Sequence, residues 1–261
     1  MGTVAVKNLD LRFGSSPERQ VVALDGLSME ITDKQFAVIV GPSGCGKSSL
    51  LDVIAGLREP SSGACLLDGK EIHGPGKERG MVFQNYSLFP WLTVLKNVEF
   101  GLVLQGKPRA EATGRARHYV NSVGLSGFEN AYPNQLSGGM KQRVAIARSL
   151  ANNPEVILMD EPFGALDSQT RIVMQQLLLG IWEKEHKTVL FVTHDIDEAL
   201  YLGEKVYVMS ARPGRIIDTI SIGFAHPRSY ELSTSPEFVE LKRRIQHSLH
   251  AEVHKAIAPA A

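Results

Sequence analysis

The sequence has no long hydrophobic run and very few cysteines. No apolar stretch approaches the roughly 18 residues that a membrane-spanning helix needs, and the N-terminus lacks the hydrophobic region of a signal peptide. The two cysteines, Cys45 and Cys65, do not have the spacing of a metal site. We therefore expect a reduced, cytosolic protein that acts at a membrane only through a partner.

The chain also lacks an excess of charge of either sign. Lys plus Arg and Asp plus Glu number 28 each, so no overall field draws the protein to nucleic acid or to acidic lipid. Its apolar content of 43% and charged content of 21% are ordinary for a globular protein. At 261 residues it is long enough for one large core or two smaller lobes.

Residues 41–49 carry a specific motif. They read GPSGCGKSS, which fits the pattern G-x-x-x-x-G-K-[ST] of a phosphate-binding loop. Residues 35–40 before it are a nearly continuous apolar run, typical of a buried strand, and Lys47–Ala55 after it has helical spacing. The alternative, a purely structural glycine turn, is disfavoured because strand, lysine, serine and helix are all in place.

This loop predicts a nucleotide site. Its glycines allow successive backbone N–H groups to point at one centre, and the helix N-terminus adds partial positive charge. Lys47 is expected to reach the β- and γ-phosphates, and the Ser48 hydroxyl is a ligand for Mg²⁺. The expected nucleotide-binding residues are Gly41, Pro42, Ser43, Gly44, Cys45, Gly46, Lys47, Ser48 and Ser49.

An antiparallel β layer is predicted on both sides of the loop in the sequence. Val4–Phe13 and Val21–Ile31 have strand composition, and Asp25-Gly26 predicts a two-residue hairpin within the second stretch. A second such pair, Asp68-Gly69, predicts a hairpin after the loop. Phe13 either stacks on a nucleotide base or packs in the strand core, and the sequence leaves both open.

Residues 80–84 (GMVFQ) predict another short strand that ends in Gln84, a residue type that can ligand Mg²⁺ or position water. Residues 86–91 then form a loop with large apolar side chains, among them Leu88, Phe89 and Trp91. Exposed apolar groups on a loop indicate a docking surface. The alternative is that these side chains fill the core of a helical insert.

Residues 136–143 (LSGGMKQR) open another helix, with Ser137, Gly138 and Gly139 in its first turn. The glycines expose free N–H groups at the positive end of the helix, beside a hydroxyl, which predicts a second anion site. An ordinary N-cap serine would be the preferred interpretation if this stretch stood alone.

Two further buried strands end in polar residues. Residues 156–159 (VILM) lead to Asp160 and Glu161, which are suited to holding Mg²⁺ through water and to polarising an attacking water. Thr188–Thr193 leads to His194. Because open α/β sheets bind ligands at the carboxyl ends of their strands, we expect these three side chains at the site.

Taken together, the motifs resemble the nucleotide-binding subunit of ATP-binding cassette (ABC) transporters up to about residue 220. The resemblance implies an α/β fold: a P-loop NTPase core, an antiparallel β subdomain, and an α-helical subdomain inserted at about residues 89–152. It implies an ATPase domain over residues 1–225 and a C-terminal helical extension over 226–261. The implied activity is Mg²⁺-dependent hydrolysis of ATP coupled to transport.

The resemblance also implies roles for single residues. Phe13 matches the residue that stacks on adenine, Glu161 the catalytic base, and His194 the sensor of the γ-phosphate. Ser48, Gln84 and Asp160 match the metal site, and Gln84 also communicates with the membrane subunit. Ser137, Gly138, Gly139 and Asp167 would contact nucleotide and partner in a head-to-tail dimer. Met140 departs from the family, because many relatives have glutamine there.

A narrower resemblance concerns transport. Residues 87–102 and 209–216 look most like importer ATPases for nitrate, sulfonate, taurine and related small anions. This implies a separate permease that docks near residues 86–91, an indirect substrate-binding protein, and a peripheral location at the cytoplasmic face of the inner membrane. The alternatives are an exporter ATPase with a separate membrane subunit, and a non-transport ABC ATPase, which zero net charge and a single cassette disfavour.

The last predicted helix follows Ser235-Pro236 and has one apolar face. Its histidines, His247, His250 and His254, share the opposite face. We interpret them as a solvated surface.

Overall fold

The computed structural model describes residues 2–14 and 20–257 and divides into two units. Unit 1 comprises Met1–Gly76 and His186–Ala261, and unit 2 comprises Lys77–Glu185. The chain therefore leaves unit 1 after Gly76 and returns to it at His186. Among the described helices, none is both long and apolar enough to cross a membrane.

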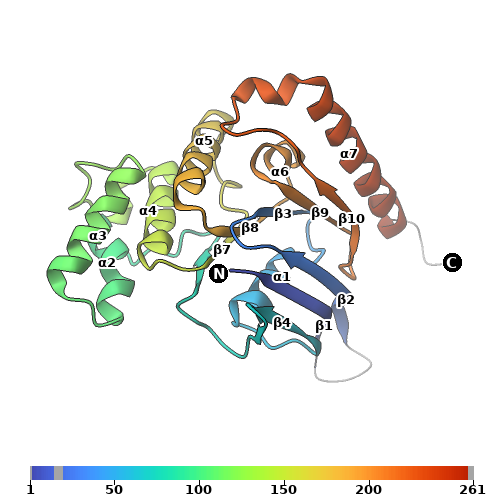
Figure 1. Ribbon diagram of the computed structural model, residues 1–261, viewed down its shortest axis with the longest axis horizontal. Coiled ribbons are helices and arrows are strands. Elements are labelled where there is room, and N and C mark those ends of the chain that lie inside the picture. The colour runs from blue at the N-terminus through green and yellow to red at the C-terminus, as the bar shows by residue number, and fades with distance from the viewer. Residues whose placement is uncertain (1, 15–19, 258–261) are drawn as a thin grey trace. The chain divides into compact units, whose positions relative to one another are not determined.

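The core of unit 1 is a mostly parallel sheet. Every residue of its two central strands is buried, as expected when helices lie on both faces (Figure 1). The strand order is β10 (Ile216–Ser221), β9 (Lys205–Met209), β3 (Phe36–Val40), β8 (Thr188–Thr193), and β10 alone is antiparallel to its neighbour. Helix α1 (Lys47–Ala55) lies on one face, and α6 (Ile196–Leu202) and α7 (Pro236–Ile257) lie on the other.

Unit 1 also contains the expected antiparallel layer. Its strand order is β2 (Val21–Ile31), β1 (Val4–Phe13), β4 (Ser62–Leu67), β5 (Lys70–Glu71). Asp68 and Gly69 join β4 to β5 with φ of 49° and 78°, the left-handed pair that a two-residue hairpin requires. The predicted hairpin at Asp68-Gly69 is confirmed.

The predicted hairpin at Asp25-Gly26 is wrong, because β2 runs through both residues as one strand. Leu9 pairs with Leu27 and Leu11 with Leu24, so β2 has one extra residue there, which is a β-bulge. Gly26 takes a φ of 58°, and its N–H donates to the Asp10 carboxylate at 2.7 Å. Positive φ suits a bulge as well as a hairpin, and pairing along the length of β1 decides between them.

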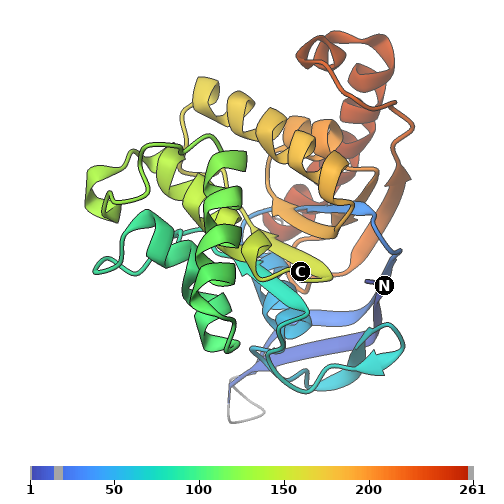
Figure 2. The ribbon, with the colours of Figure 1, turned by 60° about the vertical axis from the view of Figure 1, so that its left-hand side comes forward.

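Unit 2 contains a short parallel pair of strands, β6 (Arg79–Val82) and β7 (Val156–Asp160). Its helices α2 (Val94–Leu104), α3 (Arg109–Ser122) and α4 (Gly138–Ala151) pack against one another (Figure 2). The expected insert at residues 89–152 falls within this unit. The unit also contains helix α5 (Ser168–Glu185).

Helix α7 begins where the sequence indicates, since the Ser235 hydroxyl accepts the N–H of Phe238 at 3.2 Å. Phe238 and Ile245 are fully buried, whereas His247 and His250 are exposed. The side chain of His254 lies outside the described residues. Both cysteines are buried and neither forms a disulfide within the described residues. Burial raises the pKa of Cys65 to about 12, so its thiol stays protonated.

Candidate functional site

The phosphate loop in unit 1 closes around its lysine. It connects the buried strand β3 to α1, and Gly44 and Gly46 turn it with φ of 77° and 106°. Lys47 is only 4% exposed, and its Nζ donates to the carbonyl oxygens of Gly41 at 2.9 Å and Pro42 at 3.0 Å. These contacts hold the ammonium group inside the loop.

Two glycines of the loop have no room for a side chain. A Cβ on Gly41 would lie 3.0 Å from both the Cys45 sulfur and the Met209 carbonyl oxygen. A Cβ on Gly46 would lie 2.9 Å from Leu24 and would need a left-handed backbone besides. The loop is therefore pressed against the core, with the N–H groups of the first turn of α1 available to an anion.

Phe13 ends strand β1 and is half-buried. The guanidinium carbon of Arg58 lies 4.8 Å from the centroid of its ring. Phe13 is therefore only partly withdrawn from water and has a cation over its ring, and both interpretations that the sequence left open remain predictions. Sequence reasoning did not identify Arg58, because nothing in the local pattern indicates that it reaches a ring 45 residues earlier in the chain.

His194 also belongs to unit 1 and is exposed at the end of β8. The neighbouring residues hold it in place. The hydroxyl of Thr193 donates to the buried carboxylate of Glu198 and accepts the N–H of Asp195 at 3.0 Å. Asp195 in turn caps α6 through the N–H groups of Asp197 and Glu198. The histidine thus lies in a fixed turn between a strand and a capped helix.

In unit 2 the structure brings Gln84 and Glu161 together. A Cβ on Gly164 would lie 3.9 Å from both Gln84 Nε2 and Glu161 Oε2, so the two side chains approach the same point. Asp160 is the last residue of β7, after four buried residues, and is half-buried. Glu161 has a φ of 40°, a conformation that non-glycine residues adopt mainly where the surroundings enforce it, often at functional sites.

The residues Ser137–Gly139, which we name the signature turn, begin helix α4. Ser137 is its N-cap and accepts the N–H of Met140 at 3.3 Å, so the ordinary capping role is present beside the predicted anion site. A Cβ on Gly139 would lie 2.8 Å from Thr170. The N–H of Thr170 donates to Asp167 at 3.0 Å and lowers the pKa of this exposed carboxyl below its usual range. The signature turn and the Asp167 turn are therefore neighbours.

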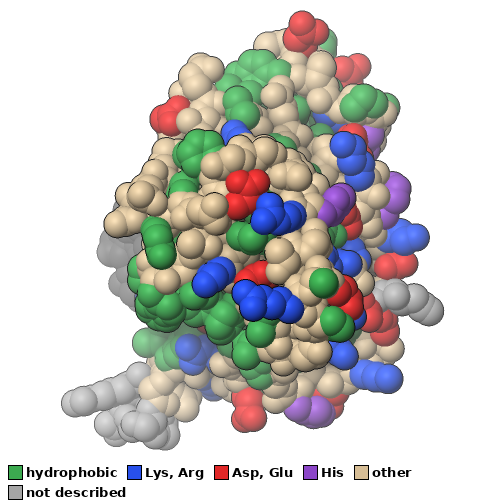
Figure 3. Space-filling model, turned by 90° about the vertical axis from the view of Figure 1, so that its left-hand side faces the viewer, with side chains coloured by type: hydrophobic (Ala, Val, Ile, Leu, Met, Phe, Trp, Pro, Cys, Tyr) green, Lys and Arg blue, Asp and Glu red, His purple; other side chains and the backbone are tan. Residues whose placement is uncertain are grey.

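The apolar loop at residues 86–91 borders a groove of about 520 Å³. The groove is lined on its apolar side by Phe83, Phe89, Phe100 and Leu104. Leu88 and Phe89 are half-buried, whereas Trp91 is 70% exposed. Hydrophobic side chains gather in the lower left part of the face of the molecule shown in Figure 3. The interpretation of all three side chains as buried core of the helical insert is wrong for Trp91.

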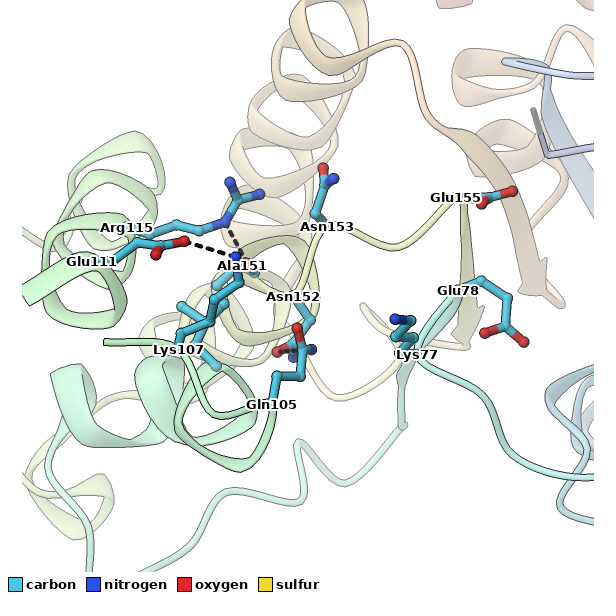
Figure 4. A pocket seen from close by; sticks show the side chains of 11 residues that line it. Lys77, Glu78, Gln105, Lys107, Glu111, Arg115, Ala151, Asn152, Asn153 and Glu155 are labelled. Atoms are coloured by element: carbon cyan, nitrogen blue, oxygen red, sulfur yellow. Dashed lines mark hydrogen bonds and ion pairs between the residues drawn. The ribbon is translucent and has the colours of Figure 1, made fainter. Parts of the chain in front are cut away.

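A second cavity in unit 2, of about 270 Å³, contains none of the predicted site residues (Figure 4). Lys77, Lys107 and Arg115 line it together with three glutamates, so its charges balance. Lys107 pairs with Glu111 at 2.8 Å, and Arg115 Nε donates to the Ala151 carbonyl oxygen at 2.6 Å. The cavity therefore has no clear preference for a charged ligand.

Sequence comparisons give the same family for nearly the whole chain. The family model described as ABC transporter matches residues 24–164. An uncharacterized ABC transporter ATP-binding protein of Methanocaldococcus jannaschii is 54% identical over 252 residues, which cover 97% of this chain and 93% of that protein. A nitrate import ATP-binding protein of Synechocystis sp. is 50% identical, with 88% of each chain covered. A taurine import ATP-binding protein of Rhizobium johnstonii is 47% identical, with 94% and 96% covered.

A solved structure agrees with the sequence comparisons. A dimeric ATP-binding cassette in a post-hydrolysis state with ADP and Pi has a TM-score of 0.75 and 37% sequence identity, and the match covers 85% of this chain and 100% of that one. The motifs of the phosphate loop, the signature turn and the strand ends thus occur in a chain that matches the cassette in sequence and fold. This chain belongs to the ABC transporter family, as an ATP-binding subunit with the cassette fold.

Proposed function

We propose that this chain is the ATP-hydrolysing subunit of an importer for a small anion such as nitrate, a sulfonate or taurine. The observation that carries the proposal is the similarity, at 47–50% identity over 88–94% of the chain, to proteins named for nitrate and taurine import. The same names count against an exporter and against a non-transport ATPase. The imported anion itself would be recognised by other subunits.

The phosphate loop supplies the binding of ATP in this proposal. Lys47 is already held inside the loop by two carbonyl oxygens, so an arriving phosphate needs little rearrangement of the backbone. Because Gly41 and Gly46 have no side chain, the loop can lie directly against the core atoms of Cys45, Met209 and Leu24. Phe13 would contact the adenine ring and His194 the γ-phosphate.

Glu161 would accept the proton of the attacking water, with Gln84 beside it to orient that water. The donor set of Ser48, Gln84 and Asp160 fits Mg²⁺, because all three offer the hard oxygen atoms that this ion prefers. Bound Mg²⁺ would neutralise negative charge on the phosphates. The phosphate loop covers only one side of the γ-phosphate, so the signature turn of a second subunit would supply the remaining donors, and Asp167 would contact that subunit.

The residues 86–91, which we name the docking loop, would bind the permease. An exposed Trp91 beside an apolar groove has the composition of a protein interface, in which buried aromatic residues contribute most of the affinity. Docking through this loop would hold the chain at the cytoplasmic face of the inner membrane.

The test is uptake by a complete transporter reconstituted in vesicles. Nitrate, taurine and a short alkyl sulfonate are offered separately, with ATP on the side of this chain. Glu161→Gln keeps the shape of the side chain but removes its basicity, so ATP should still bind while turnover falls by a factor on the order of 10² to 10⁴. We expect the wild-type transporter to take up one of the three anions. The Glu161→Gln variant should not take up that anion.

The same assay tests the docking loop. Trp91→Asp should abolish assembly with the permease while the isolated chain keeps its ATP affinity and its melting temperature. Val173→Asp is the matched control, since Val173 is another exposed apolar residue of unit 2, at 49% exposure, outside the loop. Outward movement of substrate, or wild-type uptake that does not depend on ATP, would contradict the proposed function.

A further inference from the structure

Arg148 attaches the docking loop to helix α4. Its Nη1 donates to the carbonyl oxygen of Ser87 at 2.6 Å, and its Nη2 donates to that of Tyr86 at 3.0 Å. Its guanidinium carbon lies 5.7 Å from the centroid of the Phe89 ring. A single side chain of α4 therefore contacts three residues of the loop.

The backbone of the loop requires such support. Tyr86 and Ser87 have φ of 59° and 47°, two successive residues in the left-handed region that L side chains rarely adopt. Such conformations persist only where neighbouring groups enforce them, and here a charged guanidinium binds both carbonyl oxygens. Burial lowers the pKa of Arg148, in agreement with a guanidinium that is largely withdrawn from water.

The second half of the docking loop is attached to helix α2. The fully buried Asn97 accepts the N–H of Phe89 at 2.8 Å through its Oδ1. Its Nδ2 lies within hydrogen-bond distance of the carbonyl oxygens of Phe89, Leu92 and Thr93, at 3.1, 2.9 and 3.0 Å. Both halves of the loop are thus bonded to helices, so the loop is expected to move with α2 and α4.

Tyr86 extends this connection to the signature turn. Its hydroxyl oxygen lies 3.3 Å from the position of a Cβ on Gly138, the first residue of α4. Arg148 is ten residues farther along the same helix, a distance of about 15 Å at 1.5 Å per residue. Tyr86 is therefore in contact with the signature turn while Arg148 binds its carbonyl group.

We propose that Arg148 is a positioning residue that makes the docking loop and the signature turn one rigid piece. The inference rests on the proposed function, since it assumes that the permease binds this loop. When the permease displaces the docking loop, the signature turn, which would face the partner's nucleotide, then moves with it. This coupling does not require a movement of Gln84. Coupling between permease and ATP site would depend on the two carbonyl contacts of Arg148.

The test compares Arg148→Gln with Arg115→Gln. Arg115 also donates to a carbonyl oxygen of α4, that of Ala151, but it does not contact the docking loop in any described interaction. Both variants are assembled with the permease, and the ratio of substrate-stimulated to basal ATPase is measured. Melting temperature, ATP affinity of the isolated chain and hydrogen exchange of residues 84–92 are measured alongside.

In Arg148→Gln we expect faster exchange in residues 84–92 and loss of most of the stimulation, so that the ratio falls toward the value of an ATPase that does not respond to substrate. ATP affinity should stay at the wild-type value, and Arg115→Gln should keep the wild-type ratio. A normal ratio in a variant with a loosened loop would overturn the proposal, because Arg148 would then only stabilise the fold. Equal loss of the ratio in both variants would overturn it as well.

If Arg148→Gln does not fold, Arg148→Lys answers the same question. One ammonium group lacks the planar fork that binds two carbonyl oxygens at once, so the ratio should fall in a folded protein. An unchanged ratio with Lys would contradict the inference. The wild-type complex is measured first, and absence of stimulation there would show that the proposed function, and the inference with it, is wrong.

Discussion

The guanidinium of Arg58 lies over the ring of Phe13 in unit 1, and this pair bears on adenine binding. A guanidinium on one face of an aromatic ring fixes the ring and leaves the opposite face for a second partner. The half-buried state of Phe13 agrees with a ring that packs on one side only. The pair would then present a preformed surface to the base.

We therefore expect Phe13→Ala to weaken ATP binding by about 1 to 3 kcal/mol, the scale of stacking between a base and an aromatic side chain. The melting temperature should change little, because the ring is only half-buried. Isothermal calorimetry with ATP and a thermal melt measure the two quantities on one sample. Leu57→Ala, which removes a 52% exposed neighbour of Arg58, is the control. A lower melting temperature with unchanged ATP affinity would mean that Phe13 has a structural role and does not bind adenine.

Single residues also show what could and could not be predicted from the sequence. The sequence predicts Lys47, Ser137 and Glu161 as site residues because each belongs to a motif whose spacing has a physical reason. Arg148 and Asn97 were not identified, although they determine the position of the docking loop. A local pattern does not indicate which carbonyl oxygen a long side chain reaches when that oxygen lies 61 residues away in sequence, as Ser87 does from Arg148.

At the scale of elements, the β layer of unit 1 depends on close approach between strands. Gly63 in β4 and Gly69 in the following turn both have a φ of 78°, so a side chain is strained at either position. A Cβ on Gly63 would lie 2.2 Å from the carbonyl oxygen of Asn8, whereas a Cβ on Gly69 meets nothing within 4 Å. The two positions differ in the space around them and not in the backbone angle.

This difference predicts two distinct losses of stability. Gly69→Ala should lower the free energy of unfolding by about 1 to 2 kcal/mol, the cost of a left-handed backbone for an L residue. Gly63→Ala should lower it by roughly 1 to 3 kcal/mol more, because atoms must shift as in an overpacked core. Urea unfolding of both variants measures the difference. Equal losses would mean that β1 moves away from β4 at little cost.

Most elements could be predicted from hydrophobic patterns, because buried strands such as β3 and β7 are short apolar runs between turn residues. The Asp25-Gly26 bulge could not. Its two residues are equally compatible with a hairpin, and the choice depends on pairing with β1, which lies earlier in the chain. Propensity determines which conformations are open to such a pair, and tertiary pairing selects one of them.

At the scale of the whole molecule, the chain requires a second copy to complete an ATP site under the proposed function. The signature turn lies in unit 2, and the phosphate loop lies in unit 1. The solved cassette that this chain resembles is described as dimeric. A head-to-tail pair would place two ATP molecules between two chains.

Glu161→Gln should therefore run as a dimer in size-exclusion chromatography when ATP is present and as a monomer without it. Adding Ser137→Arg should abolish the dimer, because a long cation would occupy the space beside the donors of the signature turn. Ser126→Arg is the matched control, since Ser126 is an exposed serine of the same unit. A monomer at saturating ATP, in the isolated chain and in the permease complex alike, would count against the pair.

The insertion of unit 2 within unit 1 has a consequence for synthesis on the ribosome. Strand β3 pairs with β8 from Phe36 opposite Val189 onward, and with β9 from Ala37 opposite Lys205. Both edges of β3 thus stay unpaired until more than 150 further residues have been made, as the numbers of these partners show. During that interval the complete sequence of unit 2 emerges before the core sheet of unit 1 closes. The nascent chain therefore carries an apolar strand with two open edges, the kind of segment that chaperones protect from aggregation.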